Sequence, residues 1–282
     1  MNTAAEQHNV RRLNDGEAAE ILRFLAVRPI ETVFMAGLLR DNGVVSEQNR
    51  GTFYGYRNVH GKLEGVALIG HATHFEARTQ PALKALARAA QRATSASLVR
   101  GNEIEMSQFW DEYGSFTKAP RLVCNELLLQ KPATGSSHST ALNLRPATLD
   151  DLEQILTINA QLFMTESGRN PLLTNPQGFR KRTARRIKRG RVWVWTKSGE
   201  VIFKTEILAD TPQAMYLESL YVAPAQRRKG YGLIGLIQLG SILARSTDRL
   251  CLTVNRTSDS ALAFYRKAGY RVHSHYQTLY LQ

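Results

Sequence analysis

The sequence predicts an α/β (α+β) protein made of two domains that begin alike. At 282 residues the chain is long enough for about two domains of ordinary size. A polar, turn-rich segment at residues 131–141 has the composition of a linker. Each half starts with a short strand-like segment and then a residue that can cap a helix, which is Asn14 or Asp15 in the first half and Thr148 in the second. This shared order indicates a duplicated unit.

The composition is that of a globular protein rather than a membrane or disulfide-rich one. Hydrophobic residues make up 43% of the chain, and no apolar run approaches the ~20 residues that a membrane span needs. The N-terminal residues lack the apolar core of a signal peptide. The two cysteines, Cys124 and Cys251, fall one in each half, so we expect buried free thiols and a cytoplasmic location. No residue spacing resembles a metal site.

Positive charge is concentrated in the second half of the chain. The formal net charge is +13, of which residues 141–282 supply +11, with 21 basic against 10 acidic residues. Eight cations fall within the twelve positions from Arg180 to Arg191. This run is either a solvated helix face or a binding site for an acidic substrate or nucleic acid. Nucleic acid is the less favoured partner because no aromatic residues interleave the run.

In the first half, the apolar spacing predicts a series of alternating elements. They are a strand at 9–13, helices at 14–25 and 29–42, a hairpin of 53–56 and 63–69, a helix at 81–93, a strand at 98–99, a helix at 104–113 and a strand at 122–129. Residues 70–78 are predicted to form a loop, in which His71 and His74 are ordinary loop histidines rather than metal ligands.

The second half repeats this pattern with a strand at 142–146 and a helix beginning at 148. A hairpin of 192–195 and 201–207 follows, turning at Ser198-Gly199. Trp193 and Trp195 share one face of its first strand and are predicted to lie in the core. The hairpin leads into the stretch from Met215 to Leu243, which dominates the functional interpretation.

That stretch combines a strand, a basic turn and a glycine-led helix. The strand at 215–222 is followed by a proline turn, the cations of 227–229, and Gly230-Tyr231-Gly232 at the start of an apolar helix. The exposed backbone N–H groups of a helix N-terminus bind phosphate. The dinucleotide fingerprint Gly-x-Gly-x-x-Gly is also present, but it would require glycine directly at the strand end and a later acidic residue, and both are missing.

Two motifs resemble those of the GCN5-related N-acetyltransferase (GNAT) superfamily. The first is Arg227-x-x-Gly230-x-Gly232, preceded by Val222-x-Pro224, and the second is Val254-Asn255 with the helix and strand start at 261–270. The resemblance implies two tandem GNAT-like domains, each a mixed, mostly antiparallel sheet flanked by helices. Residues 1–130 would form a degenerate domain without a phosphate loop, 131–141 the linker, and 142–282 the acetyl-CoA-binding catalytic domain.

The resemblance also implies roles for individual residues. The pantetheine arm of acetyl-CoA would lie along Leu220, Tyr221 and Val222 and contact Asn255. The pyrophosphate would bind Arg227, Arg228, Lys229, Gly230, Tyr231 and Gly232. Ser258 stands where family members commonly have an asparagine, and it can cap the following helix.

Two residues are expected to move protons. Tyr265 matches the tyrosine that protonates the leaving thiolate, and Glu218 lies where many members place a base acting directly or through water. The alternative interpretations are a packed tyrosine and a carboxylate paired with a local cation. The expected function is acetyl transfer from acetyl-CoA to a primary amine of an unidentified acceptor, without a metal, and the sequence leaves open whether that acceptor is acidic. The alternative is a non-catalytic module that senses acyl-CoA or binds an anionic partner.

Overall fold

The computed structural model describes residues 9–93, 96–114, 119–133 and 144–281, which form two compact units. The described residues up to Leu129, with 253–259 and 272–281, make the first unit. Residues 130–252 and 260–271 make the second. The C-terminal strand therefore groups with the first unit, although it follows the second half in sequence. The predicted division into a degenerate domain ending at residue 130 and a catalytic domain beginning at residue 142 stays a prediction.

The first unit is a mixed sheet covered by helices on both faces. Its strands follow the order β1 (Val10–Arg12), β2 (Gly51–Arg57), β3 (Leu63–Gly70), β4 (Ala72–Ala77), β5 (Leu98–Asn102), β12 (Arg271–Tyr280) and β6 (Leu122–Pro132). Strands β1 to β4 pair antiparallel, β4 and β5 pair parallel, and β12 pairs antiparallel with β5. Its helices are α2 (Ala18–Leu25), α3 (Val33–Asn42), α4 (Gln80–Gln91) and α5 (Glu103–Tyr113), with short 3-10 turns at Asp15–Glu17 and Glu47–Asn49.

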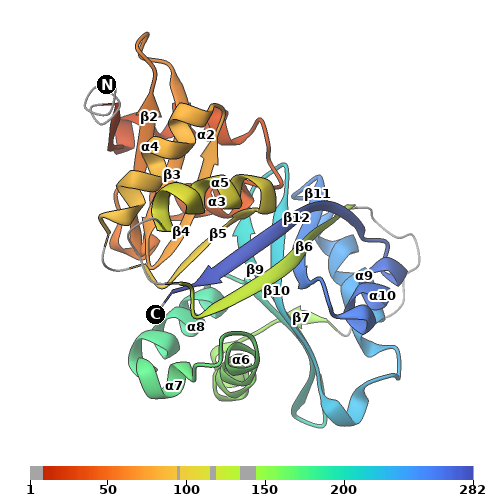
Figure 1. Cartoon of the computed structure of the whole chain (residues 1–282). Coiled ribbons are helices and arrows are strands. Elements are labelled where there is room, and N and C mark those ends of the chain that lie inside the picture. The colour runs from red at the N-terminus through yellow and green to blue at the C-terminus, as the bar shows by residue number, and fades with distance from the viewer. Residues whose placement is uncertain (1–8, 94–95, 115–118, 134–143, 282) are drawn as a thin grey trace. The chain divides into compact units, whose positions relative to one another are not determined.

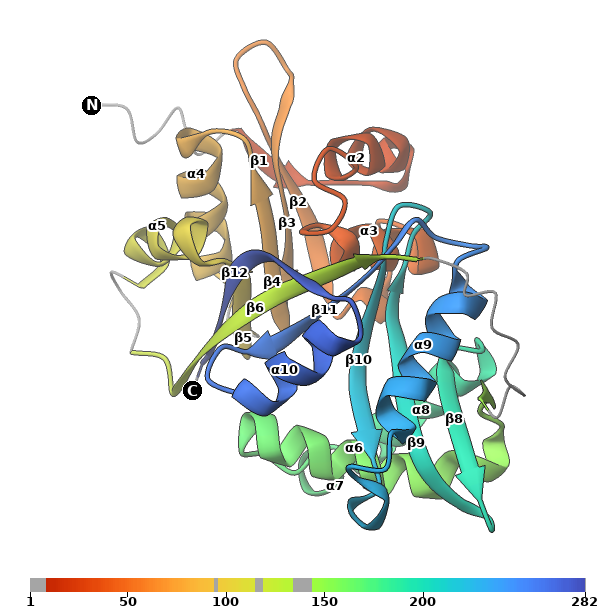
Figure 2. The same cartoon turned by 90° about the vertical axis from the view of Figure 1, so that its right-hand side faces the viewer.

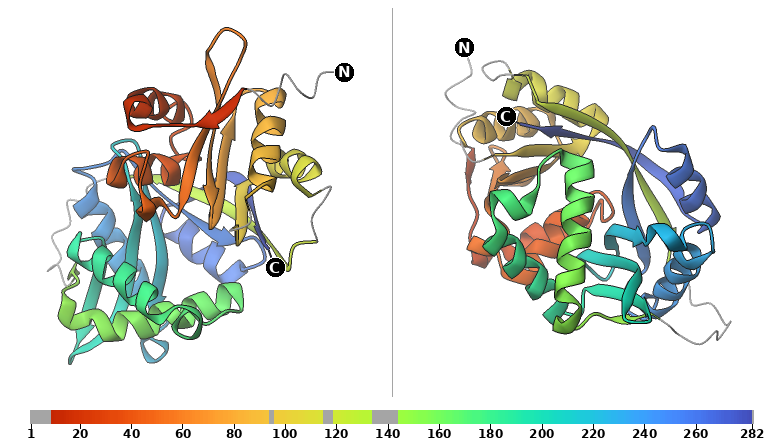
Figure 3. Two further views of the ribbon diagram at one scale, coloured as in Figure 1. Left: turned by 90° about the vertical axis from the view of Figure 1, so that its left-hand side faces the viewer. Right: turned by 90° about the horizontal axis from the view of Figure 1, so that it is seen from below.

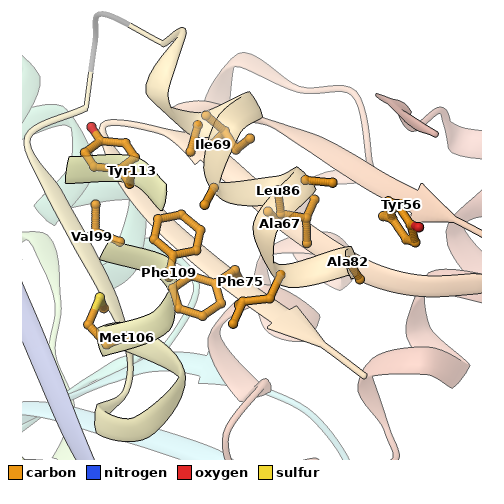
Figure 4. Close-up of a cluster of buried hydrophobic side chains, with 14 of the residues drawn as sticks. Tyr56, Ala67, Ile69, Phe75, Ala82, Leu86, Val99, Met106, Phe109 and Tyr113 are labelled. Carbon is orange, nitrogen blue, oxygen red and sulfur yellow. The ribbon is translucent and has the colours of Figure 1, made fainter. Parts of the chain in front are cut away.

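Alternation along β3 supplies a hydrophobic core on each face of this sheet. Val66 and Leu68 belong to a cluster with residues of α2 and α3, whereas Ala67 and Ile69 belong to one with residues of α4 and α5. The two pairs of helices lie on opposite faces of the sheet (Figure 2). In the second cluster, the rings of Phe75 and Phe109 stack at 4.2 Å (Figure 4). These two clusters explain why a nearly continuous apolar run forms a central strand here.

The second unit has the same type of sheet. Its order is β11 (Arg249–Asn255), β10 (Met215–Val222), β9 (Glu200–Asp210), β8 (Val192–Lys197) and β7 (Arg145–Pro146), in which only β10 and β11 run parallel. Its helices are α6 (Leu152–Ser167), α7 (Pro171–Thr174), α8 (Pro176–Lys188), α9 (Tyr231–Leu243) and α10 (Asp259–Lys267), with 3-10 turns at Leu149–Asp151 and Pro224–Gln226. Helix α9 covers one face of β8–β10, and the green helices α6 and α8 cover the other (Figures 1, 2 and 3). The predicted α/β class, with mostly antiparallel sheets flanked by helices, is confirmed.

Three local predictions were wrong or incomplete. Pro29 does not begin α3, which starts at Val33 after a turn. The segment predicted as a loop at 70–78 contains strand β4, and His74 lies within it with its ring 4.2 Å from that of Phe34. Burial, and then the charge of Arg100, lowers the pKa of His74 to about 3. At the linker, β6 continues to Pro132, and residues 134–143, with the start of the strand predicted at 142, lie outside the described residues.

The two tryptophans of β8 are less buried than the core position predicted for them. Val192 and Val194 are buried in the core with α6 and α8, whereas Trp193 and Trp195 are half-buried on the opposite face. The Trp195 ring meets the ring of Tyr231, at the start of α9, edge-on at 5.0 Å. Within the described residues neither cysteine forms a disulfide bond; Cys251 is buried and Cys124 half-buried.

Helix α9 offers a matched test of this packing. A Cβ at Gly235 would lie 2.9 Å from ring atoms of Phe203 on β9, whereas one at Gly240 would approach only the end of the Lys131 side chain, at 3.3 Å, and Leu250 at 3.6 Å. We expect Gly235→Ala to lower the free energy of unfolding by about 1–3 kcal/mol through overpacking. Gly240→Ala should leave it unchanged or raise it by up to about 1 kcal/mol through helix propensity. Urea unfolding of both variants measures this, and equal effects would contradict the packing.

Candidate active site

The site begins where β10 leaves its parallel neighbour. The strand pairs with β11 only at Met215–Leu250 and Tyr216–Cys251. Past this point the described residues show no further pairing between the two strands, so one edge of β10 loses its partner. From Glu218 to Val222 the strand is half-exposed. An unpaired strand edge of this kind can accept an extended ligand by backbone hydrogen bonding.

A β-bulge interrupts β10 at the same place. Ser219 and Leu220 stand opposite the single residue Thr205 of β9, and Ser219 adopts a left-handed conformation with φ 53°. Two side chains of β9 stabilise the bulge: Thr205 Oγ1 donates to the Glu218 carbonyl at 3.1 Å, and Lys204 Nζ donates to the Ser219 carbonyl at 3.3 Å. The bulge therefore reorients the backbone at the residues predicted to contact the pantetheine.

The loop between β10 and α9 has the features of an anion-binding site. Arg227, Arg228 and Lys229 are exposed, and Arg228 has a positive φ of 60°. The helix begins after Gly230, which has φ 87°; no side chain of the described residues caps it, and its first turn contains no acidic residue. The first N–H groups of α9 therefore lie next to exposed cations, and no described side chain competes with an anion for their hydrogen bonds.

Close packing explains the second glycine of the motif. A Cβ at Gly232 would lie 3.1 Å from Val222 and 3.3 Å from the Phe264 ring, so a side chain here would crowd the junction of strand, helix and α10. The Tyr231 ring packs edge-on against the Trp195 ring, and the Tyr231 backbone N–H lies in the first turn of α9, where N–H groups have no partner within the helix. Arg227 Nε donates to the Val222 carbonyl at 3.2 Å and so ties the loop to the strand end.

Tyr265 lies on α10 in a cluster of aromatic rings. Its ring centroid is 5.1 Å from that of Phe264 and 5.7 Å from that of Tyr270. Burial, followed by the influence of Tyr216 and Glu166, raises the pKa of Tyr265 above its ordinary value. Tyr216 is the last residue of β10 that pairs with β11. Tyr265 therefore lies close to the point where the two strands separate. A tyrosine in this setting keeps its proton at neutral pH.

Glu218 is paired with a cation. Arg186 Nη1, on α8, donates to Glu218 Oε1 at 2.7 Å and to Glu206 Oε2 at 2.6 Å. This contact is compatible with the ion-pair interpretation of Glu218, and its role as a base stays a prediction. Arg186 itself was predicted only as one of the cations in the run from Arg180 to Arg191.

Behind Glu218 lies a fully buried ionic network that the sequence analysis missed. Lys204 and Glu206 have no exposed side-chain surface and pair at 2.6 Å. Asn159, on α6, donates to Glu206 at 2.6 Å and accepts from Lys204. Desolvation opposes ionisation of Glu206, but the charges of Lys204 and Arg186 outweigh it and lower the pKa of Glu206. The signal was present: two opposite charges at alternate positions of an apolar strand share one face.

Asn255 and Ser258 fall in segment 253–259, which groups with the first unit. Asn255 Oδ1 accepts hydrogen bonds from the N–H of Thr257 at 2.9 Å and from its hydroxyl at 2.8 Å. The Ser258 N–H donates to the Asn255 carbonyl at 3.0 Å. Asn255 therefore has a local role in the turn before α10, and the cofactor contacts predicted for both residues stay predictions.

The equivalent connection in the first unit is much shorter. Only Arg78 and Thr79 separate β4 from α4, against residues 223–230 between β10 and α9. Thr79 Oγ1 accepts from the Ala82 N–H at 3.4 Å, and Pro81, in the first turn of α4, has no N–H. The strand end beside it contains Glu76, which is 2% exposed and pairs with Arg78 and, at 3.3 Å, with Arg28. Among the described residues, this connection therefore has neither the length nor the glycine pair of the loop before α9.

Within the described residues, no group of three or more His, Cys, Asp or Glu side chains could bind a metal ion. None of the helices in the same part of the chain has the length and apolar character to cross a bilayer.

The buried network makes a prediction about acid stability. The pKa of Glu206 is lower in the folded state than the value of about 4.5 expected when unfolded, so its stabilising contribution is complete above that pH and is lost as pH falls below it. Glu206→Gln should cost about 3–5 kcal/mol near pH 6 by leaving buried cations undercompensated. The difference from wild type should shrink between pH 5 and pH 3.

Glu200→Gln, an exposed carboxylate on the same strand, serves as the control and should change stability by less than about 0.5 kcal/mol. Urea unfolding at each pH provides the measurement. A difference between wild type and Glu206→Gln that stays constant with pH would contradict the assigned ionisation.

Comparison with known proteins agrees with this geometry. Residues 188–272 match the model of an acetyltransferase (GNAT) domain. No curated protein matches the chain significantly. Among solved structures, a Drosophila protein aligns over 97% of this chain and 98% of its own, with 13% identity and a TM-score of 0.71. A GNAT-family acetyltransferase from Colwellia psychrerythraea aligns over 97% and 99%, with 12% identity and a TM-score of 0.57.

A tandem GNAT protein from the clavulanic acid biosynthesis pathway aligns over 96% of this chain and 98% of its own, with 13% identity and a TM-score of 0.56. At such identities the solved structures establish the fold, and the family model identifies the domain. Residues 188–272 are therefore identified as a GNAT acetyltransferase domain, and the chain as a whole shares the fold of solved GNAT proteins, one of which is a tandem GNAT protein.

Proposed function

We propose that the second half of the chain is an acetyl-CoA-dependent N-acetyltransferase acting on a primary amine. One observation supports this most: the bulged strand β10 leads through an exposed cationic loop into the uncapped N-terminus of α9. An open strand edge suits an extended amide-containing arm, and the helix start suits the pyrophosphate next to it. GNAT acetyltransferases use acetyl-CoA as the acetyl donor.

The residues present fit this cofactor. The backbone of Leu220, Tyr221 and Val222 is available to pair with the pantetheine arm. The N–H groups around Gly230 to Gly232, with the side chains of 227–229, would bind the pyrophosphate. Bound acetyl-CoA supplies an acetyl group activated as a thioester.

Two side chains would transfer protons while the bond from nitrogen to carbonyl carbon forms and the bond from carbon to sulfur breaks. Glu218 takes the proton that the attacking amine loses, directly or through water. Tyr265 gives its proton to the leaving sulfur, and its raised pKa keeps that proton available at neutral pH. Arg186 orients the Glu218 carboxylate through the hydrogen bond at 2.7 Å.

We further propose that the first half does not bind acetyl-CoA. The connection of two residues before α4 is too short for a phosphate loop, and the helix start is capped by Thr79. The charged pair of Glu76 and Arg28 lies at the end of β4. The first half would then contribute to the fold or to acceptor binding.

An assay of amine-dependent release of free CoA thiol, with acetyl-CoA and a panel of primary amines, tests the function. Tyr265→Phe should slow turnover by about 10²-fold while acetyl-CoA affinity changes by less than about twofold, because it removes only the proton donor. Tyr270→Phe is the matched control: its buried hydroxyl has no hydrogen-bond partner among the described residues, so turnover should not change.

Equal turnover of wild type and Tyr265→Phe would rule out the proton-donor role. Binding of acetyl-CoA without transfer to any amine would contradict the enzyme proposal and favour the acyl-CoA-binding module.

A further inference from the structure

The cations of α8 differ in whether an acidic partner or solvent compensates their positive charge. Arg180 pairs with Glu153 at 2.5 Å on the surface, and Arg186 pairs with the two carboxylates described above. Lys181 and Lys188 are exposed to solvent. For these four cations, either an acidic partner or water satisfies the charge.

Arg182 has neither full hydration nor a partner within the described part of the chain. Its side chain is half-buried, and it makes no hydrogen bond or ion pair with any described residue. Burial, and then the charges of Arg186 and Arg185, lowers the pKa of Arg182. A cation that is partly desolvated beside two others costs free energy, which an anion at the same place would recover.

Arg182 lies on the same helix as Arg186, the partner of the proposed base Glu218. Arg182 precedes Arg186 by four residues, so the two side chains lie on one face of α8, about 6 Å apart along the helix axis. Arg186 contacts Glu218 directly. An anion bound by Arg182 would therefore lie on the same face of α8 from which Arg186 contacts the carboxylate proposed to receive the amine proton.

We propose that Arg182 binds an oxyanion of the acceptor, so that the substrate is a small molecule with a primary amine and a carboxylate or phosphate group. The planar guanidinium can donate two parallel hydrogen bonds to either oxyanion, which fixes the orientation of the acceptor. This inference rests on the proposed function, since it places the acceptor amine at Glu218.

The test compares wild type, Arg182→Gln and Lys181→Gln, the last being an exposed neighbour that loses the same charge. In the first arm, acetyl transfer is measured with two acceptor pairs, β-alanine against its amide and phosphoethanolamine against ethanolamine. We expect the acidic member of at least one pair to be preferred, and the better pair to identify carboxylate or phosphate. Arg182→Gln should lower kcat/KM for that acid at least about tenfold and leave its neutral partner unaffected.

The second arm does not depend on turnover. Inorganic phosphate is titrated into the three proteins in the presence of saturating CoA, which would occupy the loop before α9. Phosphate affinity should fall at least about tenfold in Arg182→Gln and change by less than about twofold in Lys181→Gln.

Equal phosphate binding by all three proteins, or transfer that ignores the acidic group of the acceptor, would overturn the assignment of Arg182. Absence of transfer to every amine, with the difference in phosphate affinity retained, would refute the proposed function and leave the anion site standing.

Discussion

The second unit depends on a salt bridge that water does not reach. Lys204 and Glu206 have no exposed side-chain surface, and each is bonded to Asn159 on α6. Arg186 extends the same network from α8 to Glu218 on β10, and Lys204 also reaches the Ser219 carbonyl. Burial of charge is costly unless every partner is in place, so this network fixes two helices and the bulged strand in one arrangement. The strand edge proposed to bind acetyl-CoA is the edge of β10 that faces away from β9 at this bulge.

The two units differ in the connection that leads from the parallel-paired strand into the following helix. Both place a helix after the strand that pairs parallel with its neighbour. In the second unit, residues 223–230 widen that connection and end in a glycine with positive φ; in the first, two residues suffice and Thr79 caps the helix. Phosphate binding needs free N–H groups and room in front of them, and these depend on the connection rather than on the sheet. A fold shared by both halves therefore does not imply two active sites.

The sequence predicted the elements well because their signals are local. The capping box at Asn14, the turn at Ser198-Gly199 and the glycine-led start of α9 each depend on a few neighbouring residues. Predictions failed where distant contacts decide the outcome. Strand β4 forms because β3 and β5 pair with it, although His74 and Glu76 make its sequence resemble a loop. The grouping of β12 with the first unit depends on pairing with β5, more than 170 residues earlier in the chain, which no local pattern encodes. The loop at 227–232 was identified by glycine spacing, whereas the network at Lys204 required knowledge of which strand face is covered.

The central claim, that acetyl-CoA binds at the start of α9, is tested most directly by calorimetric titration of acetyl-CoA into wild type, Gly230→Glu and Gly199→Glu. Both glycines belong to the second unit and have a positive φ, 87° and 80°, so the two substitutions introduce similar strain and the same charge. Only Gly230 lies where the pyrophosphate is proposed to bind. We expect wild type and Gly199→Glu to bind acetyl-CoA with similar affinity. Gly230→Glu should lose at least about 10²-fold in affinity, since its carboxylate would lie beside the phosphate and repel it. Equal binding by all three proteins would place the cofactor elsewhere in the chain and contradict the account.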